Sequence, residues 1–377
     1  MANEGNTLRI ALASPAENAW SETFIAAHID RLDKVELLLT GGVPPRRASL
    51  GGPLVAEAGL ALLRDRVLGK LHGGLPGLAL RRLAGRLARI RPDVVLAEYG
   101  TMGAEIAAAC ERAGVPLVAH FHGFDAHRTD YIEHYGGYRT LFEYAAALVV
   151  VSRAMEAQLL ALGAPRSKVI YNCYGIDVDR FVPGRPDLAP PHFLAVGRFA
   201  EKKAPHLTIT AFSKVVAARP EARLTMVGRG RLWEQCKQLV QDLDLGANVE
   251  LCGVRTPDAI VELLHRSRAF VQHSIVTPNN DHEGTPLAVL EAMAAGVPVV
   301  ATRHAGIADV VAHGERGLLC TEQDVDTMAE HMIELIDTPA MALAMGQAGR
   351  AYAELEHRVE VQVGRLQRVL EMAARRT

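Results

Sequence analysis

The chain has 377 residues, of which 49% are apolar, and its formal net charge is −2 at pH 7. A domain usually takes about 100–200 residues, so this length predicts two packed units with sizeable cores. The small negative charge argues against a nucleic-acid-binding protein, because neutralising phosphates requires a surplus of cations.

A first series of short apolar runs alternates with longer helix-like segments. This alternation is typical of a parallel sheet wrapped by helices. The runs are residues 8–13, 35–40, 93–99, 116–122, 147–152 and 168–172.

Between Arg46 and Arg91 the chain carries ten cations against only Glu57 and Asp65. This basic stretch could contact anionic lipid. An ordinary solvated helix face is the alternative. The cations proposed to approach lipid are Arg81, Arg82, Arg86 and Arg89.

Histidines and an aspartate follow the fourth apolar run. Their short spacing is compatible with a metal site. However, His120 and His122 alternate on one strand face and Gly123 breaks the element, so we expect no metal there. A histidine at a strand end is also compatible with a hydrogen-bonded core residue.

The segment Pro183 to Pro191 contains four prolines and a glycine, a composition typical of a linker. A second alternating series follows, with apolar runs at 192–198, 222–228, 249–253, 269–274, 297–302 and 317–320. We therefore predict two Rossmann-like domains. The predicted boundaries are 1–184 for an N-terminal domain, 185–191 for the linker, 192–355 for a C-terminal domain and 356–377 for a terminal helix. Whether this helix returns to the N-terminal domain is left open.

Two cations follow the first run of the second series, Arg198 and, five residues later, Lys203. Cations at a strand end can clamp a diphosphate and stabilise the charge that develops on it. A solvated charge cluster is the ordinary alternative. Farther along, Gly228 and Gly230 begin a dinucleotide fingerprint, but Trp233 stands where its third glycine belongs, so a nicotinamide cofactor is disfavoured.

The segment EGTPLAVLE carries Glu283 and Glu291. Pro286 suits a helix start, and the free amides near Leu287 and Ala288, together with the helix dipole, favour an anion such as a diphosphate. Glu291, inside that helix, could accept hydrogen bonds from two ribose hydroxyls, whereas Glu283 lies outside it. An acidic pair that merely complements the dipole is the alternative interpretation.

Two glutamates in this setting resemble the signature of the retaining nucleotide-sugar transferases of glycosyltransferase family 4, whose two-domain architecture is called GT-B. The resemblance implies two Rossmann-like domains facing across a cleft. It implies that Glu291 holds the ribose, that Glu283 and His122 lie beside the donor sugar, and that Arg198 and Lys203 bind phosphate. Further donor contacts are implied for Gly228, Gly230, Gly253, Val254, Gly284, Thr285, Pro286, Leu287 and Ala288.

One departure from the family pattern is Ala204, where a glycine commonly follows the lysine, so Lys202 remains a possible substitute for Lys203. The acceptor side is carried by Ser21, Glu22, Thr23 and Asp125, in segments that resemble transferases of bacterial exopolysaccharides. A helix start capped by Ser21 is the alternative for the first three.

The resemblance predicts a hexosyltransferase that retains anomeric configuration, favours a UDP-sugar, needs neither metal nor cofactor, and acts on a saccharide or lipid-linked acceptor. A nucleotide-sugar epimerase and a non-catalytic nucleotide-sugar sensor are the alternatives. The oligomeric state is left open. The N-terminus lacks a signal-peptide pattern, and the five scattered cysteines form no CxxC pair, so we expect a cytoplasmic protein that could lie peripherally at the inner membrane face.

Overall fold

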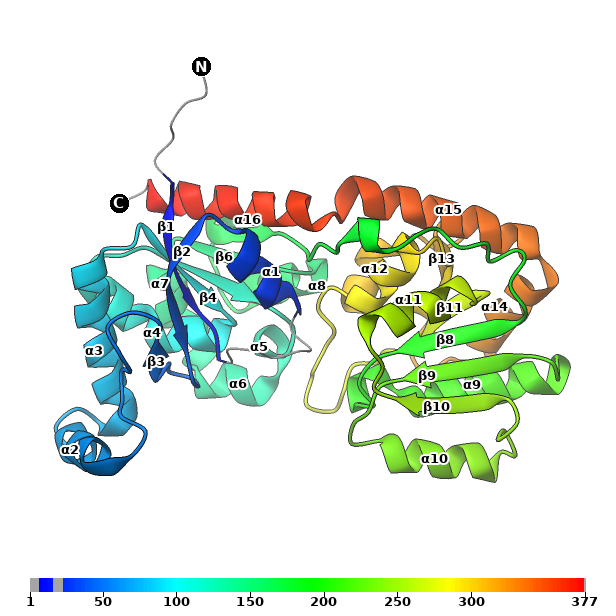
Figure 1. Cartoon of the computed structure of the whole chain (residues 1–377), viewed down its shortest axis with the longest axis horizontal. Coiled ribbons are helices and arrows are strands. Elements are labelled where there is room, and N and C mark those ends of the chain that lie inside the picture. Colours follow the sequence, from blue (N-terminus) through cyan, green and yellow to red (C-terminus); the bar gives the residue numbers. More distant parts are fainter. Residues whose placement is uncertain (1–6, 16–22, 376–377) are drawn as a thin grey trace, which may run out of the picture. The chain divides into compact units, whose positions relative to one another are not determined.

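A computed structural model describes residues 7–15 and 23–375 of the chain (Figure 1). The chain forms two compact units. The first contains the residues up to Cys173 together with those from Glu360 onward, and the second runs from Tyr174 to Val359. The predicted linker, 185–191, lies within the second unit.

The first unit is built on a seven-stranded sheet in the order β3-β2-β1-β4-β5-β6-β7, in which only the β2–β3 pair is antiparallel. Buried apolar side chains fill the central strands on both faces, as expected for a parallel sheet covered by helices. The strands are β1 (Arg9–Ala13), β2 (Lys34–Thr40), β3 (Arg47–Ala48), β4 (Val94–Glu98), β5 (Leu117–Phe121), β6 (Ala147–Val150) and β7 (Val169–Tyr171).

Helices cover this sheet, and the last one comes from the far end of the sequence. Val359, Val363, Leu366 and Leu370, whose spacing predicts a helix, are buried along α16. The side-chain amide of Gln367 in this helix accepts a hydrogen bond from the backbone amide of Asp33 and donates one to the carboxylate of Asp33. The helices are α1 (Thr23–Arg31), α2 (Gly59–Gly69), α3 (Gly74–Ile90), α4 (Gly100–Ala113), α5 (Phe124–His127), α6 (Thr129–His134), α7 (Arg139–Tyr144), α8 (Arg153–Ala161) and α16 (Val359–Ala374).

Two of the four arginines proposed to face lipid are engaged inside the first unit. Arg82 donates two hydrogen bonds of 2.7 Å to the buried carboxylate of Asp65 and so holds α2 against α3. Arg86 donates to the carbonyl oxygens of residues 50–52. Arg81 and Arg89 are exposed. Among the residues that the structure describes, no helix is long and apolar enough to span a bilayer.

The second unit contains a six-stranded, all-parallel sheet in the order β10-β9-β8-β11-β12-β13. Its strands are β8 (His192–Val196), β9 (Arg223–Val227), β10 (Val249–Gly253), β11 (Ala269–Gln272), β12 (Val299–Thr302) and β13 (Gly317–Cys320). All twelve apolar runs of the sequence coincide with strands. The short antiparallel β3 is the strand that the sequence patterns do not predict.

Local sequence signals explain where several helices of the second unit begin. Thr256 caps α11 by accepting a hydrogen bond from the amide of Ala259, and Asp324 caps α14 through the amide of Thr327. Proline occupies the first turn of α9, α11 and α15, where its missing N–H has no helical partner to lose. The helices are α9 (Pro205–Ala218), α10 (Trp233–Asp242), α11 (Pro257–His265), α12 (Leu287–Ala294), α13 (Ala305–Val310), α14 (Val325–Asp337) and α15 (Pro339–Glu356).

Candidate active site

The topology of the second sheet singles out one place for a ligand. The chain builds β8, β9 and β10 toward one edge and then returns to place β11 on the other side of β8. In open parallel sheets ligands bind beyond the strand carboxyl ends at such a reversal. The loops that follow β8 and β11 flank this point, and they carry Arg198, Lys203 and Glu283.

The loop after β8 presents two cations in different states. Arg198 is exposed, and within the described chain its guanidinium makes no hydrogen bond or ion pair. Lys203 ends a single 3₁₀ turn, and its Nζ lies 3.2 Å from Oε2 of Glu283. Two residues predicted to act on the donor are therefore in direct contact.

The neighbouring Lys202 points elsewhere. Its Nζ binds Oδ1 of Asp281 and the carbonyl oxygen of His282, both at 3.0 Å, and so ties the loop after β8 to the loop after β11. Ala204, which stands where the family commonly has glycine, has a φ of 35°, in the left-handed region that glycine enters most easily. The loop keeps this turn with alanine, and Lys203 keeps its contact with Glu283.

Glu283 is buried, and its Oε1 has no hydrogen-bond partner among the described residues. Burial alone would raise the pKa of this carboxyl, but the ammonium groups of Lys203 and Lys202 outweigh it and hold that pKa below its usual value. An ionised carboxylate with one open oxygen is a ready acceptor for a hydroxyl of a bound sugar.

A histidine and a second glutamate fix the position of Glu283. The backbone amide of Glu283 donates to Nε2 of His304 at 3.1 Å, so this nitrogen carries no proton. A ring proton therefore sits on Nδ1, which donates to Oε1 of Glu322 at 2.6 Å. The other oxygen of Glu322 accepts from the amide of Val276.

The start of α12 offers an anion site. The helix begins at Leu287, directly after Pro286, and the amides of Leu287 and Ala288 make no hydrogen bond within the described chain. Free amides at a helix start, reinforced by the dipole, favour phosphate. Gly284 and Thr285 are buried in the preceding turn, where Oγ1 of Thr285 accepts from the amide of Tyr174 at 3.2 Å.

Glu291 lies inside α12 and is half-buried. Burial raises its pKa to about 7, with a partial offset from Arg180. A carboxyl with this pKa ionises readily once hydroxyl donors are supplied to it.

The glycines after β9 have a packing role. A Cβ on Gly228, whose φ is 133°, would lie 1.9 Å from the carbonyl oxygen of Gly197, and a Cβ on Gly230 would lie 2.5 Å from that of Phe199. Both glycines thus let the loop after β9 pack directly on the loop that carries Arg198. Gly253 accepts from the amide of Gly228, and Val254, the next residue, is exposed.

In the first unit, polar residues at the ends of β4 and β5 gather around one buried carboxylate. Glu98 has no exposed surface and accepts from Nδ1 of His28 at 2.7 Å and from Nε2 of His122 at 2.8 Å. His120 lies on the same side, with Nδ1 3.5 Å from Oε2 of Glu98. Burial alone would raise the pKa of Glu98, but the three histidines hold it well below its usual value.

His122 faces into the first unit, since only 2% of its side chain is exposed. Burial and the neighbouring His120 lower its pKa to about 3, so its ring is neutral at physiological pH. Its contact with a donor sugar stays a prediction.

Asp125 organises the backbone that carries His122. Its buried carboxylate accepts from the amides of Gly100, His122 and Gly123 at 2.7 to 2.9 Å. Burial nevertheless raises its pKa to about 6. Of the predicted acceptor-side residues, Thr23 begins α1 and is exposed, whereas Ser21 and Glu22 lie outside the described residues.

One grouping has metal-binding chemistry. Ligand atoms of His28, Glu98 and His120 lie within 4.8 Å of one another. In the structure His28 is hydrogen-bonded to Glu98, and the two histidine rings stack with centroids 5.3 Å apart. The histidines account for an ionised glutamate in this dry environment.

Comparison with known proteins agrees with these features. A family model described as glycosyltransferase family 4 matches residues 26–180, and one described as glycosyl transferases group 1 matches residues 179–352. WcaL of Escherichia coli K12, a glycosyltransferase named for colanic acid biosynthesis, is 30% identical over 296 residues, which cover 76% of this chain and 72% of WcaL. The chain belongs to glycosyltransferase family 4.

Two further similarities extend over most of the chain. The amylovoran biosynthesis glycosyltransferase AmsK of Erwinia amylovora is 31% identical over 288 residues, covering 75% of this chain and 70% of AmsK. HepE of Anabaena in complex with UDP superimposes with a TM-score of 0.75 at 18% identity, covering 97% of this chain and 99% of HepE. The latter match shows the GT-B fold of this family 4 glycosyltransferase.

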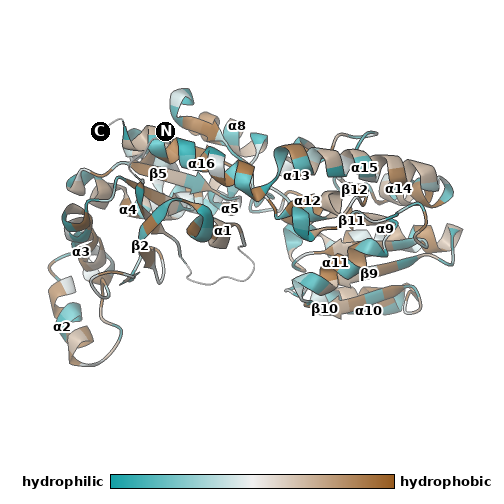
Figure 2. Cartoon of the chain, turned by 45° about the horizontal axis from the view of Figure 1, so that its top comes forward, coloured by the Kyte–Doolittle hydropathy of each residue, from teal (hydrophilic) through white to brown (hydrophobic). Residues whose placement is uncertain are grey.

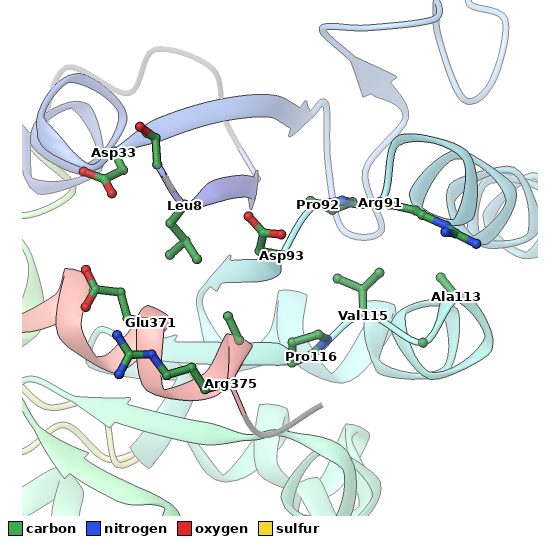
Figure 3. A pocket seen from close by; sticks show the side chains of 13 residues that line it. Leu8, Asp33, Arg91, Pro92, Asp93, Ala113, Val115, Pro116, Glu371 and Arg375 are labelled. Carbon is green, nitrogen blue, oxygen red and sulfur yellow. The ribbon is translucent and has the colours of Figure 1, made fainter. Parts of the chain in front are cut away.

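Within the first unit of this glycosyltransferase, a large open pocket lies away from the ends of β4 and β5 that carry Glu98 and His122. Figure 3 shows the side chains that line it. It has a volume of about 960 Å³ and is formed in the first unit. Leu8, Asp93 and Pro116 line it, and they precede β1, β4 and β5, so the pocket lies at the amino ends of the strands. Nucleotides bind at the carboxyl ends in this class of sheet.

Several residues of the candidate site are not identified by sequence reasoning. Glu98 is the last residue of β4, near the end of the apolar run 93–99. A polar residue at the end of an apolar run is the signal that identifies His122, and the same signal could have identified Glu98. His28, His304 and Glu322 follow no motif, because their importance comes from contacts with residues far away in sequence.

Proposed function

We propose that the chain is a retaining hexosyltransferase that takes its sugar from a nucleotide-diphosphate sugar, with a UDP-sugar favoured. The acceptor is a saccharide or lipid-linked saccharide in bacterial polysaccharide synthesis. The observation that carries this proposal is the contact between Lys203 and the buried Glu283 at the reversal point of the second sheet.

The diphosphate is the part of the donor that these groups suit best. Arg198 offers a guanidinium that has no partner among the described residues, and the amides of Leu287 and Ala288 offer two donors at a helix start. A diphosphate would also attract Lys203 away from Glu283, which would leave that carboxylate free for the sugar. These donors stabilise the negative charge that grows on the diphosphate as the bond to the sugar breaks.

The nucleoside is assigned to Glu291 and to the glycine-rich loops. A carboxylate one turn inside α12 can accept from both ribose hydroxyls, and Gly253 and Val254 offer backbone atoms to the base. Uridine is supported by the UDP that HepE holds, because the two proteins share their fold over nearly the whole chain.

In the proposed reaction the bond between the anomeric carbon and the diphosphate oxygen breaks, and the acceptor hydroxyl oxygen bonds to the same carbon from the same face. Because the hydroxyl attacks from the face that the diphosphate leaves, the anomeric configuration is retained, and the acceptor proton passes to the departing diphosphate. In this scheme Arg198 and Lys203 stabilise the negative charge that develops on the diphosphate. The polysaccharide pathways for which WcaL and AmsK are named support a saccharide acceptor.

A product assay separates the transferase from its alternatives. The protein is incubated with UDP-[¹⁴C]glucose or UDP-[¹⁴C]galactose, with and without a polyprenyl-diphosphate-linked monosaccharide. Label that moves to the lipid with retained configuration supports the proposal. Isomerised nucleotide sugar without an acceptor would indicate an epimerase, and an intact donor that raises the melting temperature would indicate a sensor.

A further inference from the structure

Glu98 and His120 occupy matched positions on neighbouring strands of the first sheet. The strands β4 and β5 pair in parallel, and Glu98 lies opposite His120 in their register. Side chains at paired positions point to the same face of a sheet, because neighbouring strands share the pleat. Neither side chain has more than 1% of its surface exposed. The two strands therefore carry a carboxylate and an imidazole side by side in the interior.

The helix α1 brings a second imidazole to the same place. Ile25 and His28, three residues apart, are the buried residues of this helix, so they share the face that packs on the sheet. Nδ1 of His28 lies 2.7 Å from Oε1 of Glu98, and residues 70 positions apart in the chain thus meet in one cluster. Figure 2 shows α1 beside the sheet of the first unit, with polar and apolar residues along its ribbon.

The ligand atoms of this cluster are close enough to share one ion. One nitrogen from each of His28 and His120 and one oxygen of Glu98 lie within 4.8 Å of one another. Around a tetrahedral zinc ion, with bonds about 2.1 Å long, neighbouring ligand atoms are about 3.4 Å apart, so side-chain shifts of about 1 Å gather these three. All three residues are buried, which distinguishes the cluster from ordinary groups of surface acids.

The chemistry of the three ligands selects the ion. Imidazole nitrogens suit Zn²⁺, whereas Mg²⁺ and Ca²⁺ take oxygen ligands. Two histidines and a glutamate form a recurrent zinc ligand set, in which a water completes the coordination. Among the described residues the ion-pair partners of Glu98 are histidines, with no lysine or arginine. A zinc ion at this carboxylate therefore has no fixed protein cation to compete with.

His122 provides the outer contact that a metal-binding carboxylate usually has. Its Nε2 lies 2.8 Å from Oε2 of Glu98, and 2% of its side chain is exposed. Ligating carboxylates are generally hydrogen-bonded in turn, which fixes their orientation. Asp125 accepts from the backbone amide of His122 at 2.9 Å and so holds the strand end that carries this contact. The cluster thus combines three inner ligands with an ordered outer shell.

We propose that His28, Glu98 and His120 bind one zinc ion, which joins α1 to β4 and β5. The spacing in the sequence disfavours a metal at His120 and His122, but folding supplies different partners, His28 from α1 and Glu98 from β4. The ion has a structural role: it fixes the helix on two central strands and takes no part in the transfer scheme. The inference is independent of the proposed transferase activity.

Metal titration of the full chain tests the proposal. The purified protein is stripped with dipicolinate, and ZnCl₂ is titrated in competition with a chromophoric chelator. We expect about one zinc ion per chain, with no competition from millimolar MgCl₂. The variants His28→Gln and Glu98→Gln each remove one ligand and should weaken zinc binding at least about 100-fold.

Matched controls and two further measurements separate zinc ligation from a folding defect. His134→Gln in α6 and Glu262→Gln in α11 change exposed residues of the same types and should bind zinc as the parent does. Co²⁺ should give the intense visible absorption of a four-coordinate ion in the parent and not in His28→Gln, whose circular dichroism should be unchanged. ZnCl₂ should raise the melting temperature of the stripped parent but not that of His28→Gln.

Two results would overturn the proposal. One is a stripped parent that takes up no zinc at about 10 μM free ZnCl₂, a concentration far above the dissociation constants of structural zinc sites. In that case hydrogen bonds alone hold the buried carboxylate. The other is zinc uptake that His28→Gln and Glu98→Gln leave unchanged, because this outcome would assign the ion to other histidines of the chain.

Discussion

The backbone amide of Glu283 donates a hydrogen bond to Nε2 of His304 at 3.1 Å, and Glu322 holds the other ring nitrogen. This pair of hydrogen bonds places the buried carboxylate of Glu283, in the loop after β11, opposite Lys203. Removing His304 should therefore change the position of Glu283 and leave the residues that are proposed to bind the nucleotide unchanged.

The variant His304→Ala tests whether His304 positions Glu283. Without the imidazole the Glu283 amide loses its acceptor, and we expect turnover to fall by about 10- to 100-fold, because small displacements of a reacting group have effects of this size. The dissociation constant of UDP, measured by calorimetry, should stay within about twofold of the parent value. His134→Ala, at an exposed histidine, is the control. A loss of UDP affinity equal to the loss in turnover would contradict a positioning role.

Glu283→Gln removes the charge but keeps the shape. Turnover should fall on the order of 100-fold, as for other groups that stabilise a transition-state charge. UDP should bind as tightly or more tightly, because Lys203 no longer has an anionic partner to leave. Glu262→Gln, at an exposed glutamate of α11, provides the comparison. Unchanged turnover would remove Glu283 from the mechanism.

Glu291 should make donor binding depend on pH. Its pKa is raised to about 7 by burial, and in the proposed function the ionised form accepts hydrogen bonds from the ribose. Between pH 8 and pH 6 the affinity for UDP-glucose, which does not itself titrate there, should fall by up to about tenfold. In Glu291→Gln the affinity should be lower and independent of pH. A parent profile as flat as that of the variant would exclude this role.

The same group affects stability in the opposite sense. A carboxyl whose folded pKa is raised stabilises the fold fully below its ordinary pKa, and this contribution disappears as the pH rises through 7. Relative to Glu291→Gln, the unfolding free energy of the parent should therefore drop between pH 5 and pH 8, by up to about 3 kcal/mol. Urea unfolding of both proteins across this range measures the difference.

Gly228→Ala should disrupt the loop that carries Arg198. The added Cβ would lie 1.9 Å from a carbonyl oxygen, and the backbone there has a φ of 133°, so the loop must move. We expect a loss of at least about 2 kcal/mol in unfolding free energy, together with weaker UDP binding. Gly246→Ala adds the same methyl into open space at the turn before β10 and should be tolerated. Equal behaviour of the two variants would show that the close approach does not matter.

Asp65→Ala should release α2 from α3. It leaves the partly buried Arg82 without its carboxylate, and we expect a local loss of about 2–3 kcal/mol after allowing for solvent at the arginine. Hydrogen exchange of residues 59–69 should accelerate while the central strands stay protected. Because Arg82 depresses the pKa of Asp65, the folded carboxylate stays ionised below its ordinary pKa; the stability that this contact contributes should be complete above about pH 4 and decline as the pH falls toward the depressed pKa.

The loop after β11 and the helix α12 that follows it show how much of the candidate site a local sequence pattern predicts. Three features of this segment are local: Pro286, the helix at 287–294 and the order of the two glutamates along the chain. The sequence predicts them because helix starts obey rules that act within a few residues. The contact between Glu283 and Lys203 could be suspected from the strand ends that carry them. The hydrogen bond from the Glu283 amide to His304 could not be predicted, because it depends on how the end of β12 lies beside the loop after β11.

The basic segment shows the opposite case. Composition indicates a cationic surface between residues 46 and 91, yet Arg82 and Arg86 are engaged inside the first unit. The sequence likewise gives no sign that the apolar side chains of Leu60, Leu63 and Val67 in α2 are exposed to solvent.

By itself the sequence determined the alternating strands and helices, the family and the position of the candidate donor-binding residues at the strand ends, because periodicity, turn residues and motif spacing are local properties. Tertiary structure alone decided which oxygen of Glu283 stays open, that His122 points toward Glu98, and which arginines and leucines reach solvent. Burial and pairing depend on residues brought together from distant parts of the chain, and no local pattern encodes them.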